Sequence, residues 1–209
     1  MNPTLRLRRA RPEDQRAFYE VCLRTSDNGA DGSHLHDDPG ALGHIYAGPY
    51  LKLEPDFALA LEDDQGVCGY CLGAPDSASY YERFQREWLP PIQAKLRQPG
   101  GDPARWTLTQ QLHNLLLHPA PLAYFPPAFA PWPAHLHIDL LPRAQGRGWG
   151  RRMLEQQMAA LRATGAPGVH LCVAPGNTRA QVFYRKLGFV DLPTGPDTPP
   201  DSVFLGRTL

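Results

Sequence analysis

The segment that most constrains this chain is a turn rich in glycine and arginine over residues 140–151, LLPRAQGRGWGR. It joins a predicted strand to a predicted helix. Glycine has no Cβ atom, so the backbone of such a turn can approach a ligand closely. The first N–H groups of the following helix, with the positive end of its dipole, favour an anion. Arg147 and Arg151 add positive charge, and the turn therefore predicts a site for a cofactor that carries a pyrophosphate.

The pattern within this turn is Gln145-x-x-Gly148-x-Gly150. No Gly-Lys-Ser/Thr follows it, which excludes a Walker loop, and the G-x-G-x-x-G spacing of the dinucleotide fingerprint is also missing. Taken alone, the pattern fits an ordinary tight turn between a strand and a helix equally well.

The flanking residues favour a ligand-binding turn. Residues 135–140 alternate between polar and apolar side chains and predict a strand. Apolar residues at helical spacing predict a helix over 150–161 that ends before Gly165. A second strand is expected over 169–173, and a helix with one apolar stripe over 178–187. This alternation predicts the α/β class.

Two motifs in this half of the chain resemble the cofactor-binding motifs of the GNAT superfamily of N-acetyltransferases. The first is the predicted strand with its glycine turn, and the second reads NTRAQVFYRKLGF over residues 177–189. Their order and separation match the family. The resemblance implies an α/β fold with a mixed sheet, the GNAT acyl-CoA N-acyltransferase fold, and an N-acetyltransferase that uses acetyl-CoA.

A closer resemblance covers most of the chain, which is similar to the acetyltransferase-like C-terminal domain of eukaryotic O-GlcNAcases. The similar segments are CLRT (22–25), DG (31–32), YAGPYL (46–51), LEDD (61–64), GY (69–70) and FLGR (204–207). The glycosidase part of those proteins has no room in 209 residues. We therefore expect a free-standing relative, one GNAT-like domain over 1–209. The eukaryotic domain has a degraded phosphate loop, whereas the loop of this chain is intact.

The resemblance to the GNAT superfamily implies a role for each matching residue. Cofactor binding falls on Leu140, Leu141, Gln145, Gly146, Arg147, Gly148, Trp149, Gly150, Arg151, Asn177, Ala180, Phe183 and Tyr184. Tyr184 also matches the general acid that protonates the departing sulfur, a role that suits a phenol because phenols and thiols have similar pKa values. The alternatives are a core tyrosine at 184 and a simple helix cap at Asn177.

Asp139 is the candidate general base. It interrupts an apolar strand just before the glycine turn, where a carboxylate would face the acceptor. The O-GlcNAcase domain also has an aspartate at the corresponding position. Two alternatives stay open: a structural carboxylate that accepts backbone hydrogen bonds, and His137 as the base, two residues earlier on the same face of the strand.

The charge balance excludes some classes of partner. Lysine plus arginine equals aspartate plus glutamate at 21 each, so bulk attraction to nucleic acid or to an anionic membrane is not expected. No apolar run is long enough to span a bilayer, and no hydrophobic segment follows the basic N-terminus as a signal peptide would require. We expect a cytoplasmic protein.

A metal site is not expected. The pair Cys68-x-x-Cys71 lies on a predicted strand, where positions i and i+3 face opposite sides, and no second pair completes a zinc site. These cysteines are interpreted as buried thiols. The cluster HLHDD over residues 34–38 has no known ligand spacing and is interpreted as a solvated polar loop.

Residues 75–133 are expected to form an insert between the third and fourth strands, after predicted strands at 5–8, 57–61 and 67–72. Apolar spacing predicts one helix over 80–92 and another over 106–116, followed by a segment rich in proline and aromatic residues. Its aromatic content argues against disorder. The insert would cover an acceptor pocket or form a homodimer face.

The acceptor is an unidentified amine, either a small molecule or a protein lysine. Four acidic residues in the loop after the first helix would attract a cationic acceptor, or are simply solvated: Asp27, Asp31, Asp37 and Asp38. Two other functions stay open, namely a catalytically silent binding module and a sensor of acetyl-CoA. The intact glycine turn together with Tyr184 favours the enzyme.

Overall fold

The computed structural model describes residues 4–193, 195, 198–199 and 202–209. Within these residues, one mixed sheet of seven strands has the order β1-β2-β3-β4-β5-β7-β6. The pair β4–β5 is parallel, and every other neighbouring pair is antiparallel. The strands are β1 (Arg6–Arg9), β2 (Ala58–Asp63), β3 (Gly66–Ala74), β4 (Ala134–Leu140), β5 (Gly168–Val173), β6 (Val190–Asp191) and β7 (Val203–Thr208). The predicted mixed-sheet α/β fold is confirmed.

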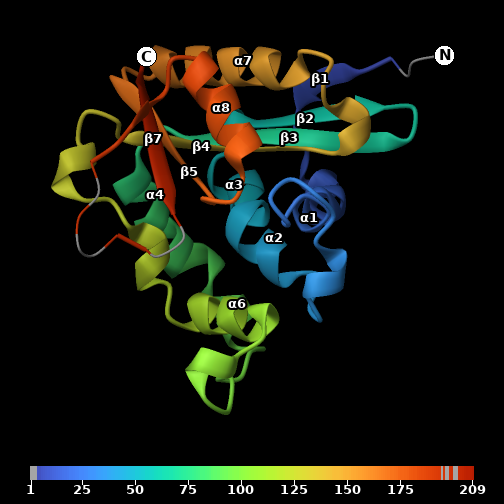
Figure 1. Ribbon diagram of the computed structural model, residues 1–209, viewed down its shortest axis with the longest axis vertical. Coiled ribbons are helices and arrows are strands. Elements are labelled where there is room, and N and C mark those ends of the chain that lie inside the picture. The colour runs from blue at the N-terminus through green and yellow to red at the C-terminus, as the bar shows by residue number, and fades with distance from the viewer. Residues whose placement is uncertain (1–3, 194, 196–197, 200–201) are drawn as a thin grey trace.

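Helices cover both faces of the sheet. Figure 1 shows α7 running along one face, while α1, α2 and α3 lie against the other. Within the described residues, no helix has the length and hydrophobicity that crossing a bilayer requires. The α-helices are α1 (Gln15–Leu23), α2 (Ala41–Tyr46), α3 (Gly48–Leu53), α4 (Ser77–Arg83), α5 (Pro90–Gln93), α6 (Leu108–Leu117), α7 (Trp149–Ala163) and α8 (Thr178–Lys186).

The central strand β3 is buried on both faces because helices pack on each side of it. On one side, Phe18 of α1 is fully buried and its ring lies 5.0 Å from that of Tyr70. On the other side, α7 comes so close that a Cβ atom at Gly73 would lie 2.3 Å from Nε2 of Gln157. The buried Gln157 amide donates a 3.0 Å hydrogen bond to the carbonyl of Phe57, which satisfies a polar group within this contact.

The sheet opens between its two parallel strands. Pairing of β4 with β5 joins Ala134 to Val169 and His135 to His170. Beyond these pairs β4 continues to Leu140 and β5 to Val173 without further pairing between them. The strands therefore diverge at the end that leads into the glycine turn, so that part of each strand edge faces the gap between them.

The insert 75–133 lies between β3 and β4, as predicted, but its first helix is not continuous. The helix expected over 80–92 is divided into α4, a π-helical segment (Phe84–Trp88) and α5. Leu89 precedes Pro90-Pro91, and proline rings disrupt the backbone hydrogen bonds of a continuing helix. The helix expected over 106–116 is confirmed as α6.

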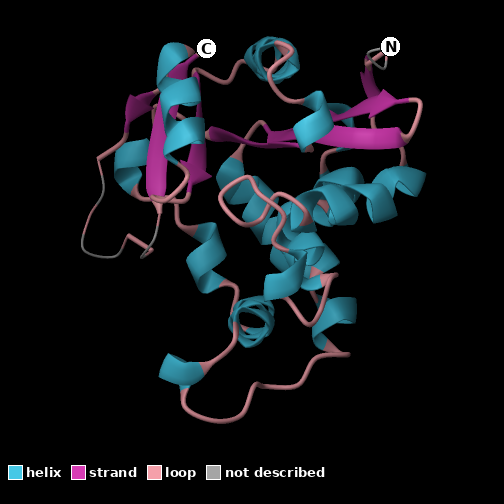
Figure 2. Ribbon diagram, turned by 45° about the vertical axis from the view of Figure 1, so that its right-hand side comes forward, coloured by secondary structure: helices cyan, strands magenta, loops and turns pink. Residues whose placement is uncertain are grey.

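The aromatic part of the insert is ordered by its own small core. Phe129 is fully buried with Leu192 and Phe204, and three further aromatic residues pack around them: Tyr124, Phe125 and Trp132. This cluster attaches the insert to β7. Figure 2 shows the strands gathered in the upper part of the molecule and helices and loops alone in the lower part, where α6 lies.

Candidate functional site

The glycine turn is fixed to the sheet at its start. The backbone N–H of Leu141 donates to the carbonyl of Cys68 at 2.8 Å, which extends the pairing with β3. The Arg143 guanidinium binds the Asp63 carboxylate at 2.8 Å, and the Gln145 side chain donates to the carbonyl of Leu140 at 2.7 Å. Arg143 and Gln145 therefore hold the turn in place.

Glycine meets two different structural requirements at the three glycine positions of the turn. Gly146 and Gly148 have φ angles of 70° and 77°, in the left-handed region, and a Cβ atom at either would meet nothing within 4 Å. Gly150 lies inside α7, where a Cβ atom would lie 3.3 Å from Cζ of Phe183. The first two thus shape an open cradle, whereas Gly150 allows α8 to pack against α7.

The N-terminus of α7 has the features of an anion site. Gly148 is the N-cap residue, and no side chain caps the first N–H groups of the helix. Arg151 is exposed and bonds Glu155 at 3.3 Å, while the Arg152 guanidinium lies 5.0 Å from the centre of the Trp149 ring. Unbonded helix N–H groups next to positive side chains suit a phosphate.

Helix α8 brings the second predicted motif to the same place. The Asn177 side chain accepts a 3.1 Å hydrogen bond from the backbone N–H of Ala180, so it caps this helix. The capping alternative is therefore present, and contact of Asn177 with a cofactor stays a prediction. Phe183 packs against Gly150, and Tyr184 turns inward with 9% of its surface exposed.

Burial raises the pKa of Tyr184, and the negative charge of Asp139 raises it further. The sequence prediction took the phenol at its ordinary pKa. The structure corrects this point: the hydroxyl keeps its proton over the physiological range, as a general acid must, but it is a weaker acid than a free phenol.

Asp139 lies in a polar cluster on the opposite face of the sheet from α7. The Tyr70 hydroxyl donates to Oδ2 of Asp139 at 2.5 Å and lies 3.2 Å from Nε2 of His137. The His137 Nε2 atom is itself 3.0 Å from Oδ2 of Asp139. Tyr70 is fully buried, whereas the His137 and Asp139 side chains are 29% and 22% exposed. Of these groups, Asp139 and His137 are therefore the ones that a molecule in solution can reach.

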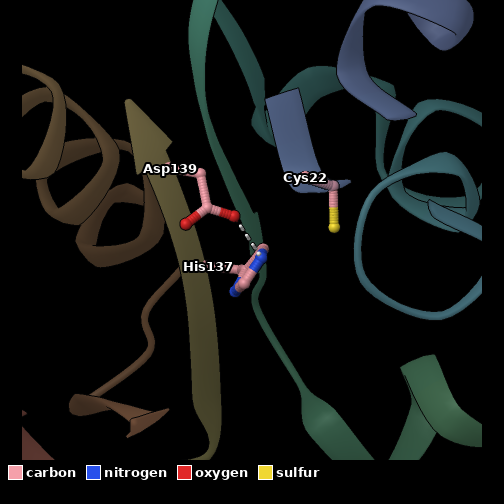
Figure 3. Close-up of side chains that lie close together, drawn as sticks. All are labelled: Cys22, His137 and Asp139. Atoms are coloured by element: carbon pink, nitrogen blue, oxygen red, sulfur yellow. Dashed lines mark ion pairs between the residues drawn. The ribbon is translucent and has the colours of Figure 1, made fainter. Parts of the chain in front are cut away.

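Cys22 of α1 completes a group of possible metal ligands with His137 and Asp139, whose donor atoms lie within 4.8 Å of one another. Figure 3 shows the three side chains and the ion pair between His137 and Asp139. The Tyr70 hydroxyl already contacts two of the three, and burial raises the pKa of the Cys22 thiol. A protonated thiol is a poor metal ligand, so the donor set fits a hydrogen-bonded cluster better than a metal site.

Sequence reasoning found Asp139 and His137 but assigned no role to Tyr70 or Cys22. Both lie in segments similar to the O-GlcNAcase domain. The missing signal was register: β3 pairs Tyr70 directly with Asp139, which places both side chains on one face.

Two other groups were considered as metal ligands from the sequence, namely the cysteine pair at 68 and 71 and the polar loop over 34–38. Cys68 and Cys71 are buried free thiols, as interpreted from the sequence. In the polar loop, Asp38 bonds His113 of α6 at 2.8 Å, and the backbone N–H of Asp37 donates to Thr109 at 2.8 Å. These bonds tie the loop to the insert, so it is not simply solvated.

Comparisons with known proteins agree with this geometry. The family model described as acetyltransferase (GNAT) family matches residues 115–189, which include β4, the glycine turn, α7, β5 and α8. The solved structure of SsHAT is 36% identical, with a TM-score of 0.87 over 99% of this chain and 98% of that chain. The fold is also similar to that of PaiA N-acetyltransferase from Thermoplasma acidophilum in complex with coenzyme A, at 13% identity and a TM-score of 0.57 over 99% of both chains.

A curated relative extends the comparison. Protein O-GlcNAcase of Rattus norvegicus is 29% identical over 199 residues, which cover 95% of this chain and 21% of that protein. Its counterpart in Mus musculus gives the same values. The chain thus spans about one fifth of the length of these relatives, and the homologous part is their C-terminal region.

Proposed function

Because the chain belongs to the GNAT acetyltransferase family, we propose that it is an N-acetyltransferase that transfers the acetyl group of acetyl-CoA to an amine. Relatives in this family bind coenzyme A or acetyl-CoA. The open cradle at Gly146 and Gly148, next to the first N–H groups of α7, fits the pyrophosphate of that cosubstrate.

Acetyl-CoA supplies a thioester, which is both the acyl donor and the source of a good leaving group. The diverging edges of β4 and β5 lie between the cradle and the Asp139 cluster, and they offer backbone groups to the chain that carries the thioester. Oriented N–H groups of this kind also stabilise negative charge on a carbonyl oxygen under attack.

Asp139 serves as the general base in this proposal. It is partly exposed, and the hydrogen bond from Tyr70 holds its carboxylate in one orientation. The amine gives its proton to Asp139 as its nitrogen bonds to the thioester carbon. His137 contacts the same oxygen and stays the alternative base.

Tyr184 serves as the general acid. When the bond between carbon and sulfur breaks, the phenol gives its proton to the sulfur, so that coenzyme A leaves as the neutral thiol. Burial raises the pKa of Tyr184 and keeps it protonated until this step. Afterwards the phenolate recovers a proton from solvent, and Asp139 releases the proton that it took from the amine.

The observation that carries the proposal is the open cradle of Gly146 and Gly148 at the N-terminus of α7, next to the place where β4 and β5 stop pairing. An anion cradle beside a partly exposed carboxylate on β4 and a protonated phenol on α8 matches the needs of acyl transfer from a thioester to an amine.

The test combines binding and turnover. Calorimetry with acetyl-CoA should show saturable binding, and an amine panel should release coenzyme A thiol. Tyr184→Phe should reduce turnover about 10²-fold while leaving acetyl-CoA affinity within a factor of about three. Unchanged turnover in Tyr184→Phe would remove the acid assignment, and binding without turnover of any amine would favour a sensor or a silent binding module.

A further inference from the structure

We propose that the acceptor is a cationic amine with no carboxylate next to its nitrogen, an inference that rests on the proposed acetyl transfer. The argument comes from the distribution of charge. The chain is neutral overall, yet its basic residues are not spread evenly over the sequence.

The cofactor side carries a concentration of arginines. The turn and α7 contain Arg143, Arg147, Arg151, Arg152 and Arg162. By contrast, five segments of 16 or more residues contain no lysine or arginine: 25–51, 53–82, 106–142, 163–178 and 187–206. This division separates a positive region, suited to an anionic cosubstrate, from regions that lack positive side chains.

Four of these segments meet around Asp139, which lies in 106–142. Segment 25–51 contributes Tyr46, whose ring lies 5.7 Å from that of His137 on β4. Segment 53–82 contributes Tyr70, and segment 163–178 contributes the exposed Cys172 of β5. His137 contacts Asp139 at 3.0 Å and is positive only when protonated, so these segments bring no permanent positive charge to the candidate base.

The arginines that border this region are neutralised by carboxylates. Arg24, at the end of α1, bonds Glu20 at 3.3 Å and lies 3.5 Å from Asp31. Arg83 of α4 binds Glu54, and Arg86 bonds Glu82 at 2.9 Å and Glu87 at 2.7 Å. These ion pairs cancel much of the arginine charge, so the arginines contribute little to the electrostatic potential at Asp139.

The acidic loop borders the same site. A Cβ atom at Gly29 would lie 3.8 Å from Nδ2 of Asn177, and one at Gly176 would lie 2.8 Å from Oδ1 of Asn28. The loop therefore packs against the turn that begins α8.

A cationic amine is attracted to this negative region; it releases one proton to solvent to become the neutral nucleophile, and Asp139 takes the second proton as the nitrogen bonds to the thioester carbon. A carboxylate beside the amine would be repelled by Asp139 without any basic residue to bind it. The half-exposed Tyr46 and Tyr81 rings offer apolar and cation–π contacts to the rest of the acceptor. Free α-amino acids should therefore be poor acceptors, and the matching decarboxylated amines should be good ones.

The experiment compares matched pairs of acceptors in a thiol-release assay at pH 8. The pairs are tyramine with tyrosine and agmatine with arginine, which differ in the carboxylate alone. We expect kcat/KM to be at least about tenfold higher for the amine of each pair, the effect of one uncompensated like-charge contact. A further arm compares cadaverine with Nα-acetyl-lysine amide, which distinguishes a small-molecule acceptor from a peptide lysine.

Variants at Cys172 test the electrostatic cause. Cys172→Lys places a positive charge at the exposed edge of the site and should reduce the preference for the amine about threefold or more. Cys172→Gln adds a long polar side chain without the charge and should keep the preference. Equal loss of preference in both variants would contradict the charge argument.

The outcomes separate this inference from the function on which it rests. Equal or better use of tyrosine and arginine overturns the inference and leaves acetyl transfer intact. If coenzyme A binds but none of these amines is acetylated, the inference is also overturned. Failure of the protein to bind acetyl-CoA counts against the proposed function instead.

Discussion

The proposed cofactor side and the proposed acceptor side of this molecule are built by different means. The cofactor side consists of a turn, two helix starts and glycines, all within residues 140–189. The acceptor side brings Cys22, Tyr46, Tyr70 and Asp139 together from distant parts of the chain. In the proposed function, a local motif binds the common cosubstrate, whereas recognition of the second substrate depends on tertiary packing. The experiments below test whether the two sides are independent.

The largest expected effect is a loss of turnover without a loss of acetyl-CoA binding. Asp139→Asn removes the proposed base, so kcat should fall 10²- to 10⁴-fold, the usual contribution of general base catalysis. Acetyl-CoA affinity, measured by calorimetry, should stay within about threefold because the cradle is untouched. His137→Gln is the matched variant, since His137 contacts the same Asp139 oxygen. If His137→Gln lowered kcat more than Asp139→Asn, His137 and not Asp139 would be the general base.

The next effect concerns the hydrogen bonds beneath the acceptor side. Tyr70→Phe removes a buried hydroxyl that bonds the partly exposed Asp139 and His137, and should lower the free energy of unfolding by about 1.5–3 kcal/mol, the net contribution of a hydrogen bond to a charged group. Tyr80→Phe is the control, because the Tyr80 hydroxyl is equally buried but has no hydrogen bond of normal geometry. That variant should change stability by less than about 0.5 kcal/mol. Urea denaturation of both proteins measures the difference, and equal losses would refute a special role for Tyr70.

A third pair of variants tests the cradle. Gly148→Ala and Gly165→Ala each place a Cβ atom at a positive φ angle, 77° and 89°, at opposite ends of α7. Each should lower stability by about 1 kcal/mol, the cost of the left-handed conformation. Gly148→Ala alone should also weaken acetyl-CoA binding, about tenfold, because its Cβ projects into the open cradle. If Gly165→Ala weakens binding as much, the effect comes from the helix and not from the cradle.

The smallest effect is a dependence of stability on pH that arises on the insert side. The Ser77 hydroxyl donates to the Pro133 carbonyl, so His135 donates to Ser77 through Nδ1 and accepts from Tyr50 through Nε2, at 2.8 Å each. This arrangement requires neutral His135, and burial lowers its pKa well below 6.5. Burial lowers the pKa of His170 in the same way.

The folded protein therefore resists protonation of both imidazoles, while the unfolded chain takes up protons below pH 6.5. Stability should be complete above that pH and should fall by up to about 1.4 kcal/mol per pH unit for each histidine as the pH drops toward 5. Thermal melts at pH 7.5, 6 and 5 measure the slope. His170→Gln should reduce it, and a slope unaffected by that variant would exclude His170 as a source.

The contrast between a local motif and tertiary packing explains which features could be predicted from the sequence. The strand, turn and helix around Gly148 follow from short-range patterns, and these elements are confirmed. The resemblance places Gly146 among the cofactor-binding residues, but its positive φ angle is a property of the folded turn that the sequence alone does not reveal. The sequence did not predict a role for Tyr70, because only the pairing register places this residue opposite Asp139. The break before α5 follows from Pro90-Pro91, which a prediction based on apolar spacing alone did not take into account.

The early end of pairing between β4 and β5 has a mechanical consequence. The sheet consists of two halves joined directly by the pairs Ala134–Val169 and His135–His170, and beyond these pairs α7, which packs on β3, β4 and β5, connects them. A ligand that bonds both exposed edges would act as a substitute strand and stiffen the whole sheet. Acetyl-CoA at a hundred times its dissociation constant should then add ~2.7 kcal/mol to stability, and hydrogen exchange should slow most along the last residues of these two strands.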